Sequence, residues 1–202
     1  MLFILFEGCS LAPYSGGVCG RPCGAEALAG AAARELEAKH GGVLCDDALS
    51  ARIEAAMRCV YARNPKLAGD YTVAVLDDGE VNAFSLPPGR IYVTRGLCAR
   101  VHDDAQWRAI ICHEIAHLEA RDHYAPPCAN DAEALAREIK ADCRAATYLH
   151  NAQLTAHTIC DVVELIRDVQ PHGWADQRIQ AVAARTPSAH RPKARLASAP
   201  GG

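Results

Sequence analysis

Along the chain, the apolar positions change from alanine-rich runs to a short β-branched segment and back again. Alanine and other strong helix formers fill residues 25–39 and 131–150, which favours helix. β-Branched and aromatic residues concentrate between 71 and 94, which favours strands. We therefore expect helices that flank a small sheet, with helices near 25–40, 46–63, 104–121, 131–150, 155–169 and 174–185 and strands near 71–76, 80–85 and 90–94.

Local turn and capping signals mark the ends of several of these elements. Asp77-Asp78-Gly79 is typical of a hairpin turn, which would join the first two strands. Pro87-Pro88-Gly89 would turn the chain before the third strand. Asp103 and Gln106 have the spacing of an N-terminal capping box, and Pro126-Pro127 prevents helix from continuing beyond the next loop. The expected fold class is α+β, mainly helical, with a small three-stranded sheet.

The helix expected at 104–121 contains the pentapeptide His113-Glu114-Ile115-Ala116-His117, an HExxH sequence. Side chains four positions apart lie on one face of an α-helix, so His113 and His117 can offer two imidazole nitrogens to one metal ion. Glu114 lies beside them. This spacing predicts a zinc hydrolase, and the alternative is an amphipathic helix with an ordinary solvated His/Glu face.

A catalytic zinc site needs a third protein ligand and an open position for water. Glu138, on the helix expected at 131–150, is the candidate for that ligand. Asp142 lies four positions later on the same helical face, where it can accept a hydrogen bond from the non-coordinating nitrogen of a zinc-bound histidine, for which we favour His113. We expect one Zn²⁺ per chain.

His123 offers a rival third ligand, because the chain nearly completes the metzincin pattern HExxHxxGxxH. Metzincins need glycine where this chain has Ala120, since the backbone turns sharply there. They also need a methionine-containing turn downstream, whereas Met1 and Met57 both lie upstream. We therefore interpret His123 as a surface histidine or one that lies just outside the ligand set.

A series of motifs in the right order carries a family resemblance. It consists of Asn82-Ala83-Phe84, a Pro-Gly turn, the segment Ile91 to Leu97, HEIAH, and then Glu138-Ile139-Lys140-Ala141-Asp142. Together they resemble the HtpX-like peptidase family, which includes the CAAX prenyl proteases. The resemblance covers about residues 71–146 and is far more specific than HExxH by itself.

This resemblance implies a zincin-like metallopeptidase of the gluzincin type, in which a glutamate is the third zinc ligand. By it, His113, His117 and Glu138 bind zinc and Glu114 is the catalytic base. Family members have a substrate-facing edge strand at the position of Asn82-Ala83-Phe84, so an extended peptide could pair its backbone with this strand. An ordinary internal hairpin strand is the alternative.

Two departures from the family pattern are visible. Only 21 positions separate His117 from Glu138 (138 minus 117), whereas family members usually have a longer helical insertion there. The C-terminal tail, in which relatives carry a Thr-His-Pro-like motif followed by arginine, fits loosely. His190 and Arg195 are the candidates for that role, as a fourth zinc contact or an oxyanion stabiliser. The alternative is an ordinary basic tail.

Length and composition agree with one domain. A chain of 202 residues that is 50% hydrophobic can bury a substantial core. We divide it into an N-terminal segment (1–24), a single zincin-like peptidase domain (25–185) and a basic, proline-containing tail (186–202). A net charge of −3 gives no basic footprint for nucleic acid, and no stretch approaches transmembrane length. We predict no nucleic-acid partner and leave the oligomeric state open.

The cysteines and the N-terminus bear on cellular location. Ten cysteines favour an exported protein, in the periplasm or cell envelope, with disulfides; a cytoplasmic location is the alternative. Residues 2–6 are apolar but too short for a signal-peptide core. We interpret segment 1–24 as the remnant of an export signal, and a miscalled start codon or a buried strand are the alternatives for its apolar start. Cys112 and Cys143 are expected to be small buried residues. The disulfide candidates are Cys19, Cys23, Cys45, Cys59, Cys98, Cys128 and Cys160.

The predicted activity is that of a zinc metalloendopeptidase acting on a protein or peptide. Zinc would lower the pKa of its water to roughly 7, and Glu114 would accept the proton as that water attacks the peptide carbonyl and then pass it to the leaving nitrogen. Three alternatives remain. They are a zinc-retaining peptide-binding or chaperone-like module with little catalysis, a metzincin-type peptidase that uses His123, and a zinc hydrolase of non-peptide amides.

Overall fold

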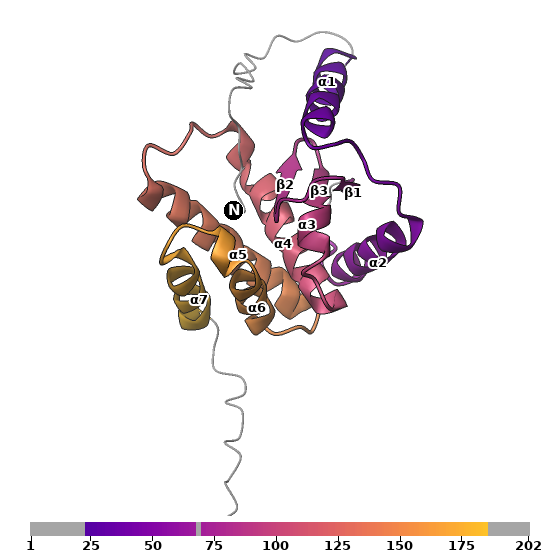
Figure 1. Ribbon diagram of the computed structural model, residues 1–202. Helices are drawn as coiled ribbons and strands as arrows, with labels where there is room; N and C mark the ends of the chain where they lie inside the picture. The colour runs from indigo at the N-terminus through magenta and orange to yellow at the C-terminus, as the bar shows by residue number, and fades with distance from the viewer. Residues whose placement is uncertain (1–22, 68–69, 186–202) are drawn as a thin grey trace, which may run out of the picture.

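Helices make up most of the described chain, residues 23–67 and 70–185 of a computed structural model, and they surround a small sheet (Figure 1). The longer helices are α1 (Cys23–Lys39), α2 (Asp47–Arg63), α4 (Asp104–Ala120), α5 (Asp131–Asn151) and α7 (Trp174–Arg185). The shorter ones are α3 (Arg95–Cys98), α6 (His157–Leu165) and the 3₁₀ turns η1 (Asp122–Tyr124) and η2 (Arg167–Val169). The strands are β1 (Thr72–Leu76), β2 (Ala83–Leu86) and β3 (Arg90–Thr94). The mainly helical α+β class expected from the sequence is confirmed.

The order of the strands differs from the expected one. The sheet runs β1-β3-β2, with β1 parallel to β3 and β2 antiparallel to it. The prediction of a hairpin between β1 and β2 through Asp77-Asp78-Gly79 is therefore wrong. The real hairpin joins β2 to β3, and the segment after β1 carries the chain past the end of β3 to the far edge of the sheet.

Two features explain this crossing. Ile91, Tyr92 and Val93 are buried on both faces of the sheet, which suits a central strand rather than an edge. The crossing loop is also held against the end of β3, because the Gly96 amide donates to the Asp78 carbonyl (2.9 Å) and Arg95 pairs with Asp77 (2.6 Å). A Cβ atom at Gly96 would lie 2.2 Å from the Glu80 carbonyl oxygen, so only glycine fits there.

Each face of the sheet packs against a different helix. Phe84, Leu86 and Tyr92 point to the α1 side, where they form a small cluster with Ala33. The opposite face contributes Ala83, Ile91 and Val93 to the main core, with residues of α2 and α4. The alternation of side chains along a strand produces this division.

Helix α4 is the centre of the molecule. It packs against α2, α5, α6 and β2, and its residues from Ala109 to His117 are all buried. Its first turn has the expected capping box, in which the Asp103 side chain accepts from the Gln106 amide (2.8 Å). It ends at Ala120, and the next residue, Arg121, has a left-handed φ of 57° that turns the chain sharply.

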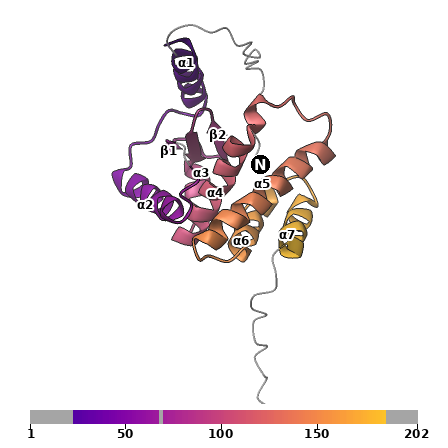
Figure 2. The ribbon, with the colours of Figure 1, turned by 180° about the vertical axis from the view of Figure 1, so that it is seen from behind.

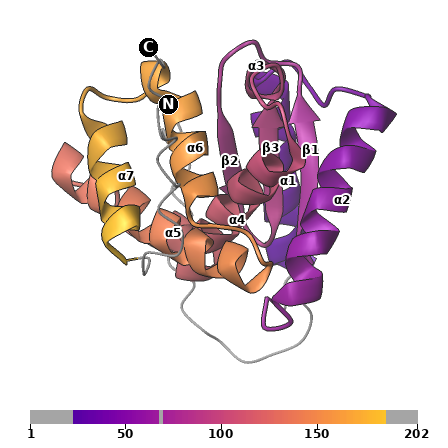
Figure 3. The same cartoon turned by 90° about the horizontal axis from the view of Figure 1, so that it is seen from below.

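The C-terminal helices form a layer on the side of α4 opposite α2 and the sheet. Figures 2 and 3 show α5, α6 and α7 together on that side. The helix expected at 155–169 is shorter than predicted, because α6 ends at Leu165 and η2 follows. Gln170 donates its side-chain amide to the Val163 carbonyl (3.0 Å), which satisfies a backbone group left open by that ending.

The cysteines in the described part of the chain form no disulfides. The expectation of disulfides is therefore wrong for these residues, and Cys19 and Cys23 lie outside the side chains that are described. The free thiols in the described residues are Cys45, Cys59, Cys98, Cys112, Cys128, Cys143 and Cys160.

None of the helices in the same part of the chain combines the length and apolar character needed to cross a bilayer.

Candidate metal centre

Three side chains from two helices converge in the interior, between α4 and α5. The Nε2 atoms of His113 and His117 are 3.1 Å apart, and each lies 3.4 Å from one oxygen of Glu138. Their exposed fractions are 3%, 1% and 6%. In the described residues this is the one group of three or more histidine, cysteine or acidic side chains whose ligand atoms all lie within 4.8 Å of one another.

Local geometry accounts for this convergence. His113 and His117 are one helical turn apart, so both imidazoles point from α4 to the same side. Glu138 lies on the buried stripe of α5, together with Leu135, Ala141 and Asp142. Because α5 packs along α4, that stripe brings the carboxylate to the two rings.

The outer nitrogen of each imidazole is held by an aspartate. His113 Nδ1 lies 2.9 Å from Asp142 Oδ1, and His117 Nδ1 lies 2.8 Å from Asp122 Oδ2. Asp122 reaches His117 because the chain turns back at Arg121. A carboxylate on one nitrogen keeps the proton there and leaves Nε2 free to bind a metal.

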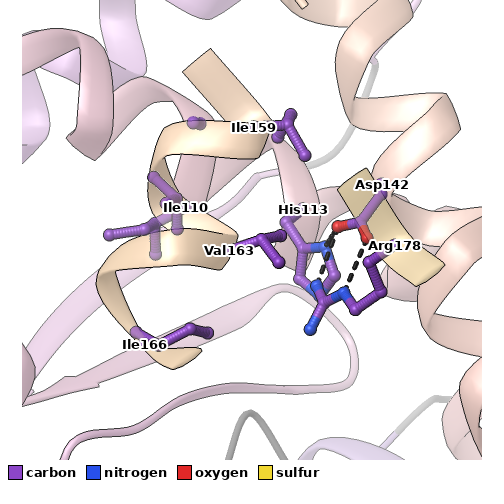
Figure 4. Close-up of a pocket in the computed structure, with 9 residues that line it drawn as sticks. Ile110, His113, Asp142, Ile159, Val163, Ile166 and Arg178 are labelled. Atoms are coloured by element: carbon purple, nitrogen blue, oxygen red, sulfur yellow. Dashed lines mark hydrogen bonds and ion pairs between the residues drawn. The ribbon is translucent and has the colours of Figure 1, made fainter. Parts of the chain in front are cut away.

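A buried arginine from α7 holds Asp142 in turn (Figure 4). Arg178 donates from Nε to Asp142 Oδ2 (2.7 Å) and from Nη2 to Asp142 Oδ1 (2.8 Å). Its Nη1 donates to Gln170 (3.0 Å) and lies 3.4 Å from Glu138 Oε2. A cavity of about 10 Å³ adjoins this pair, lined by His113 and apolar residues of α4 and α6.

These charges shift the pKa values of all three converging groups. Burial alone would lower the pKa of His117, but the neighbouring Asp122 and Glu138 carboxylates raise it to about 10. The pKa of His113 is raised in the same way by Asp142 and Glu138 against the effect of burial. Burial acts to raise the pKa of Glu138, yet Arg178 and the two imidazoles hold it well below its usual range. The neighbouring carboxylates therefore favour a positive charge on or between the two imidazoles.

Glu114 lies beside the group and has a different environment. It is 1% exposed, and its Oε2 has no hydrogen-bond partner in the described structure. Burial raises its pKa, with smaller opposing effects from His113 and His117. Its main-chain carbonyl accepts a hydrogen bond from the Ser85 hydroxyl on β2 (3.3 Å), which ties the strand to α4 at this residue.

The other residues singled out from the sequence lie in three places. Asn82-Ala83-Phe84 is buried at the start of β2, beside α4. His123 is not part of the converging group, and its Nε2 contacts the Ser85 hydroxyl at 3.2 Å. His190 and Arg195 lie outside the described residues.

Two contributors to the site were missed by sequence reasoning. Arg178 has a recognisable signal, because it lies four positions after Trp174 and four before Val182 on the buried face of α7. A charged residue on such a face needs a buried partner. Asp122 lacks a comparable signal, since its contact with His117 depends on the left-handed turn at Arg121.

The donor set fits a zinc ion. Two imidazole nitrogens and one carboxylate oxygen are the ligands found at catalytic zinc sites that keep a position open. With both Nδ1 atoms held by aspartates, the two Nε2 atoms, 3.1 Å apart, are placed to offer lone pairs to a cation between them. A buried HExxH helix whose histidines meet a glutamate from a second helix defines the class, an HExxH-type metallopeptidase.

Comparison with known proteins agrees with this class. The sequence model of peptidase family M48 matches residues 45–135. The mitochondrial metalloendopeptidase OMA1 of Arabidopsis thaliana is 39% identical over 62 residues, which are 30% of this chain and 13% of that relative. Both matches support the resemblance to HtpX-like zinc metallopeptidases that the sequence motifs indicated. The family match includes His113, Glu114 and His117 and ends before Glu138.

Proposed function

We propose that the chain is a zinc-dependent metalloendopeptidase in which Glu114 is the general base. The observation that carries the proposal is the convergence of His113, His117 and Glu138 beside a buried Glu114 with an unpaired oxygen. The match to the model of peptidase family M48 supports peptide-bond hydrolysis as the reaction class. The chain spans only 13% of the length of the matched relative, so its own activity is inferred from the site.

His113 and His117 would hold the ion through Nε2, and Glu138 through its carboxylate. Zinc bound there supplies Lewis acidity, which makes a nearby water more acidic and polarises a carbonyl group. Asp142 and Asp122 keep the Nδ1 protons of the two imidazoles in place. The burial of all three ligands excludes bulk water, which strengthens electrostatic interactions in the site.

Glu114 is suited to move a proton at its Oε2 atom. That oxygen is unpaired in the described structure, so it can accept a proton from water and deliver it to the nitrogen of the leaving amine. The raised pKa of the carboxyl favours acceptance of the proton, because burial disfavours its charged form.

The outer edge of β2 is the proposed substrate-binding edge. The Thr94 amide donates to the Asn82 carbonyl (3.0 Å), so Asn82 faces β3. Alternation along an antiparallel strand then directs the backbone groups of Ala83 and Ser85 away from β3. Because Ser85 is bonded to the Glu114 carbonyl, an extended peptide added at this edge would run past the general base.

The replacement Glu114→Gln tests the proposal. It removes the carboxylate that accepts the proton and keeps the shape of the side chain, so the rate of cleavage of unfolded casein should fall by at least about 100-fold. The zinc content, measured by elemental analysis, should stay unchanged. Glu119→Gln is the matched control, because it makes the same change on an exposed residue of the same helix.

Two results would contradict the proposal. Cleavage by Glu114→Gln at the rate of the unchanged protein would remove Glu114 from its role. Capture of casein without chelator-sensitive cleavage by the zinc-loaded protein would instead favour a peptide-binding module.

A further inference from the structure

Arg178 is the most deeply buried arginine of the described structure, with 2% of its surface exposed. It lies on α7, forty positions after Glu138 (178 minus 138). Removing a guanidinium group from water is costly unless its donors are paired. Here the Nε, Nη1 and Nη2 atoms all donate hydrogen bonds, and each of these contacts is with a buried or half-buried group.

The partners of Arg178 set it apart from an ordinary ion pair between helices. Its guanidinium group donates hydrogen bonds to both oxygens of Asp142. Asp142 Oδ1 is also the atom that lies 2.9 Å from His113 Nδ1. The carboxylate cannot rotate without breaking at least one of these contacts. His113 is therefore fixed with Nε2 toward His117 and Glu138.

Arg178 also acts on Glu138. Its Nη1 lies 3.4 Å from Glu138 Oε2, the oxygen that faces His113. Glu114, Asp122, Glu138 and Asp142 bring four carboxyl groups to one buried region. A fixed cation among them limits the mutual repulsion that would otherwise push the carboxylates apart before a metal binds.

We propose that Arg178 is a positioning residue of the metal centre, which holds Asp142 against His113 and Glu138 toward both imidazoles and thereby makes α7 necessary for tight metal binding. Arg178 itself donates no atom to the metal. The inference rests on the zinc site of the proposed function. It adds an element that lies outside the segment matched by the family model.

Arg178→Lys is the main test, because lysine keeps the charge but lacks the planar fork that grips a carboxylate at two points. The zinc dissociation constant, measured by competition with a chromophoric chelator, should rise about 10- to 100-fold. The visible spectrum of the Co²⁺-loaded protein should change as well, since it reports ligand geometry. Circular dichroism checks that the variant is folded.

Arg167→Met is the matched control. Arg167 joins Glu164 of α6 to Asp176 of α7 through exposed ion pairs (2.6 and 2.9 Å), so its loss perturbs the docking of α7 without touching the metal centre. Its zinc dissociation constant should stay within about twofold of the unchanged protein, because exposed ion pairs contribute little. A folded Arg178→Lys variant with unchanged zinc affinity and an unchanged cobalt spectrum would overturn the proposal.

A second measurement needs no variant. Hydrogen exchange of the unchanged protein should be slower in α7 with zinc than without it, because the metal would fix Glu138 and, through Arg178, the helix. Equal exchange in α7, with zinc bound and α4 protected, would overturn the inference and leave the proposed function intact. Absence of zinc binding by the unchanged protein would instead overturn the proposed function.

Discussion

At the scale of single residues, the two imidazoles differ in how their supporting carboxylates are held. Asp142 is 1% exposed and pinned by Arg178, whereas the side chain of Asp122 is 11% exposed and lies in a short turn. Burial acts to raise the pKa of Asp122, but the His117 imidazole and the positive charges of Arg137 and Lys140 lower it. The second histidine therefore depends on a contact made at the edge of the core.

Asp122→Asn should weaken metal binding. The amide keeps an acceptor oxygen but loses the negative charge that makes His117 a stronger donor to the metal, so we expect the zinc dissociation constant to rise roughly tenfold. Chelator competition measures it, and Asp161→Asn on the exposed side of α6 is the control. Equal affinities for the two variants would show that the contact between His117 and Asp122 has no influence on the metal.

The local part of the site could be predicted from the sequence. His113 and His117 follow from one helical turn, and Glu138 and Asp142 follow from another, because spacing along a helix fixes which side chains share a face. Arg178 and Asp122 could not be predicted in the same way. Arg178 meets Asp142 across 36 positions, and the position of Asp122 depends on a backbone turn at a non-glycine residue.

At the scale of elements, the helices were easier to predict than the sheet. Capping residues such as Asp103 and Asn130 act within a few positions of the helix that they start, so their effect is visible in the sequence. The pairing of strands is decided by contacts between distant segments. Asp77-Asp78-Gly79 has the composition of a hairpin turn, yet its groups bind Arg95 and Gly96 at the end of β3.

Gly96→Ala tests the importance of this crossing. The added methyl group would meet the Glu80 and Gly79 carbonyl oxygens at 2.2 and 2.3 Å, so we expect a loss of about 2 kcal/mol or more in the free energy of unfolding. Urea denaturation measures this loss. Gly30→Ala is the control, because in α1 the methyl group meets only the tip of Arg34 at 3.5 Å.

The control should change stability in the opposite direction. Alanine in a helix is more stable than glycine by about 0.5–1 kcal/mol. If both replacements changed the unfolding free energy by the same amount, the close approach at Gly96 would not matter for the fold.

At the scale of the whole molecule, the candidate metal centre lies between two layers. His113 and His117 belong to α4, which also packs against α2 and the sheet, while Glu138 and Arg178 belong to the layer of α5 and α7. A cation bound between them would cross-link these layers. The buried, acidic character of the site makes the same region unfavourable when no cation is present.

Removal of zinc should therefore lower the melting temperature. A ligand that binds only the folded state stabilises it by about 4 kcal/mol when its free concentration is about 1,000 times the dissociation constant. Thermal unfolding followed by circular dichroism, with and without a chelator, measures the shift. Glu138→Ala, which removes one of the converging groups, should show little shift on zinc addition. An identical melting temperature for the chelated and zinc-loaded protein would contradict a metal bound between the layers.

In the described chain, one edge of the sheet is covered by backbone and the other is open, and this difference limits how copies of the molecule can associate through their sheets. Residues 42–44 lie along β1, where the Leu44 amide donates to the Val75 carbonyl and the Asp77 amide to the Gly42 carbonyl. In the described chain, β2 pairs on its other side with no strand. Growth of a fibril by repeated strand stacking needs two open edges on every copy. A molecule with one open edge can take up a single guest strand and then terminates the row, so stacking at the described sheet stops after one added strand.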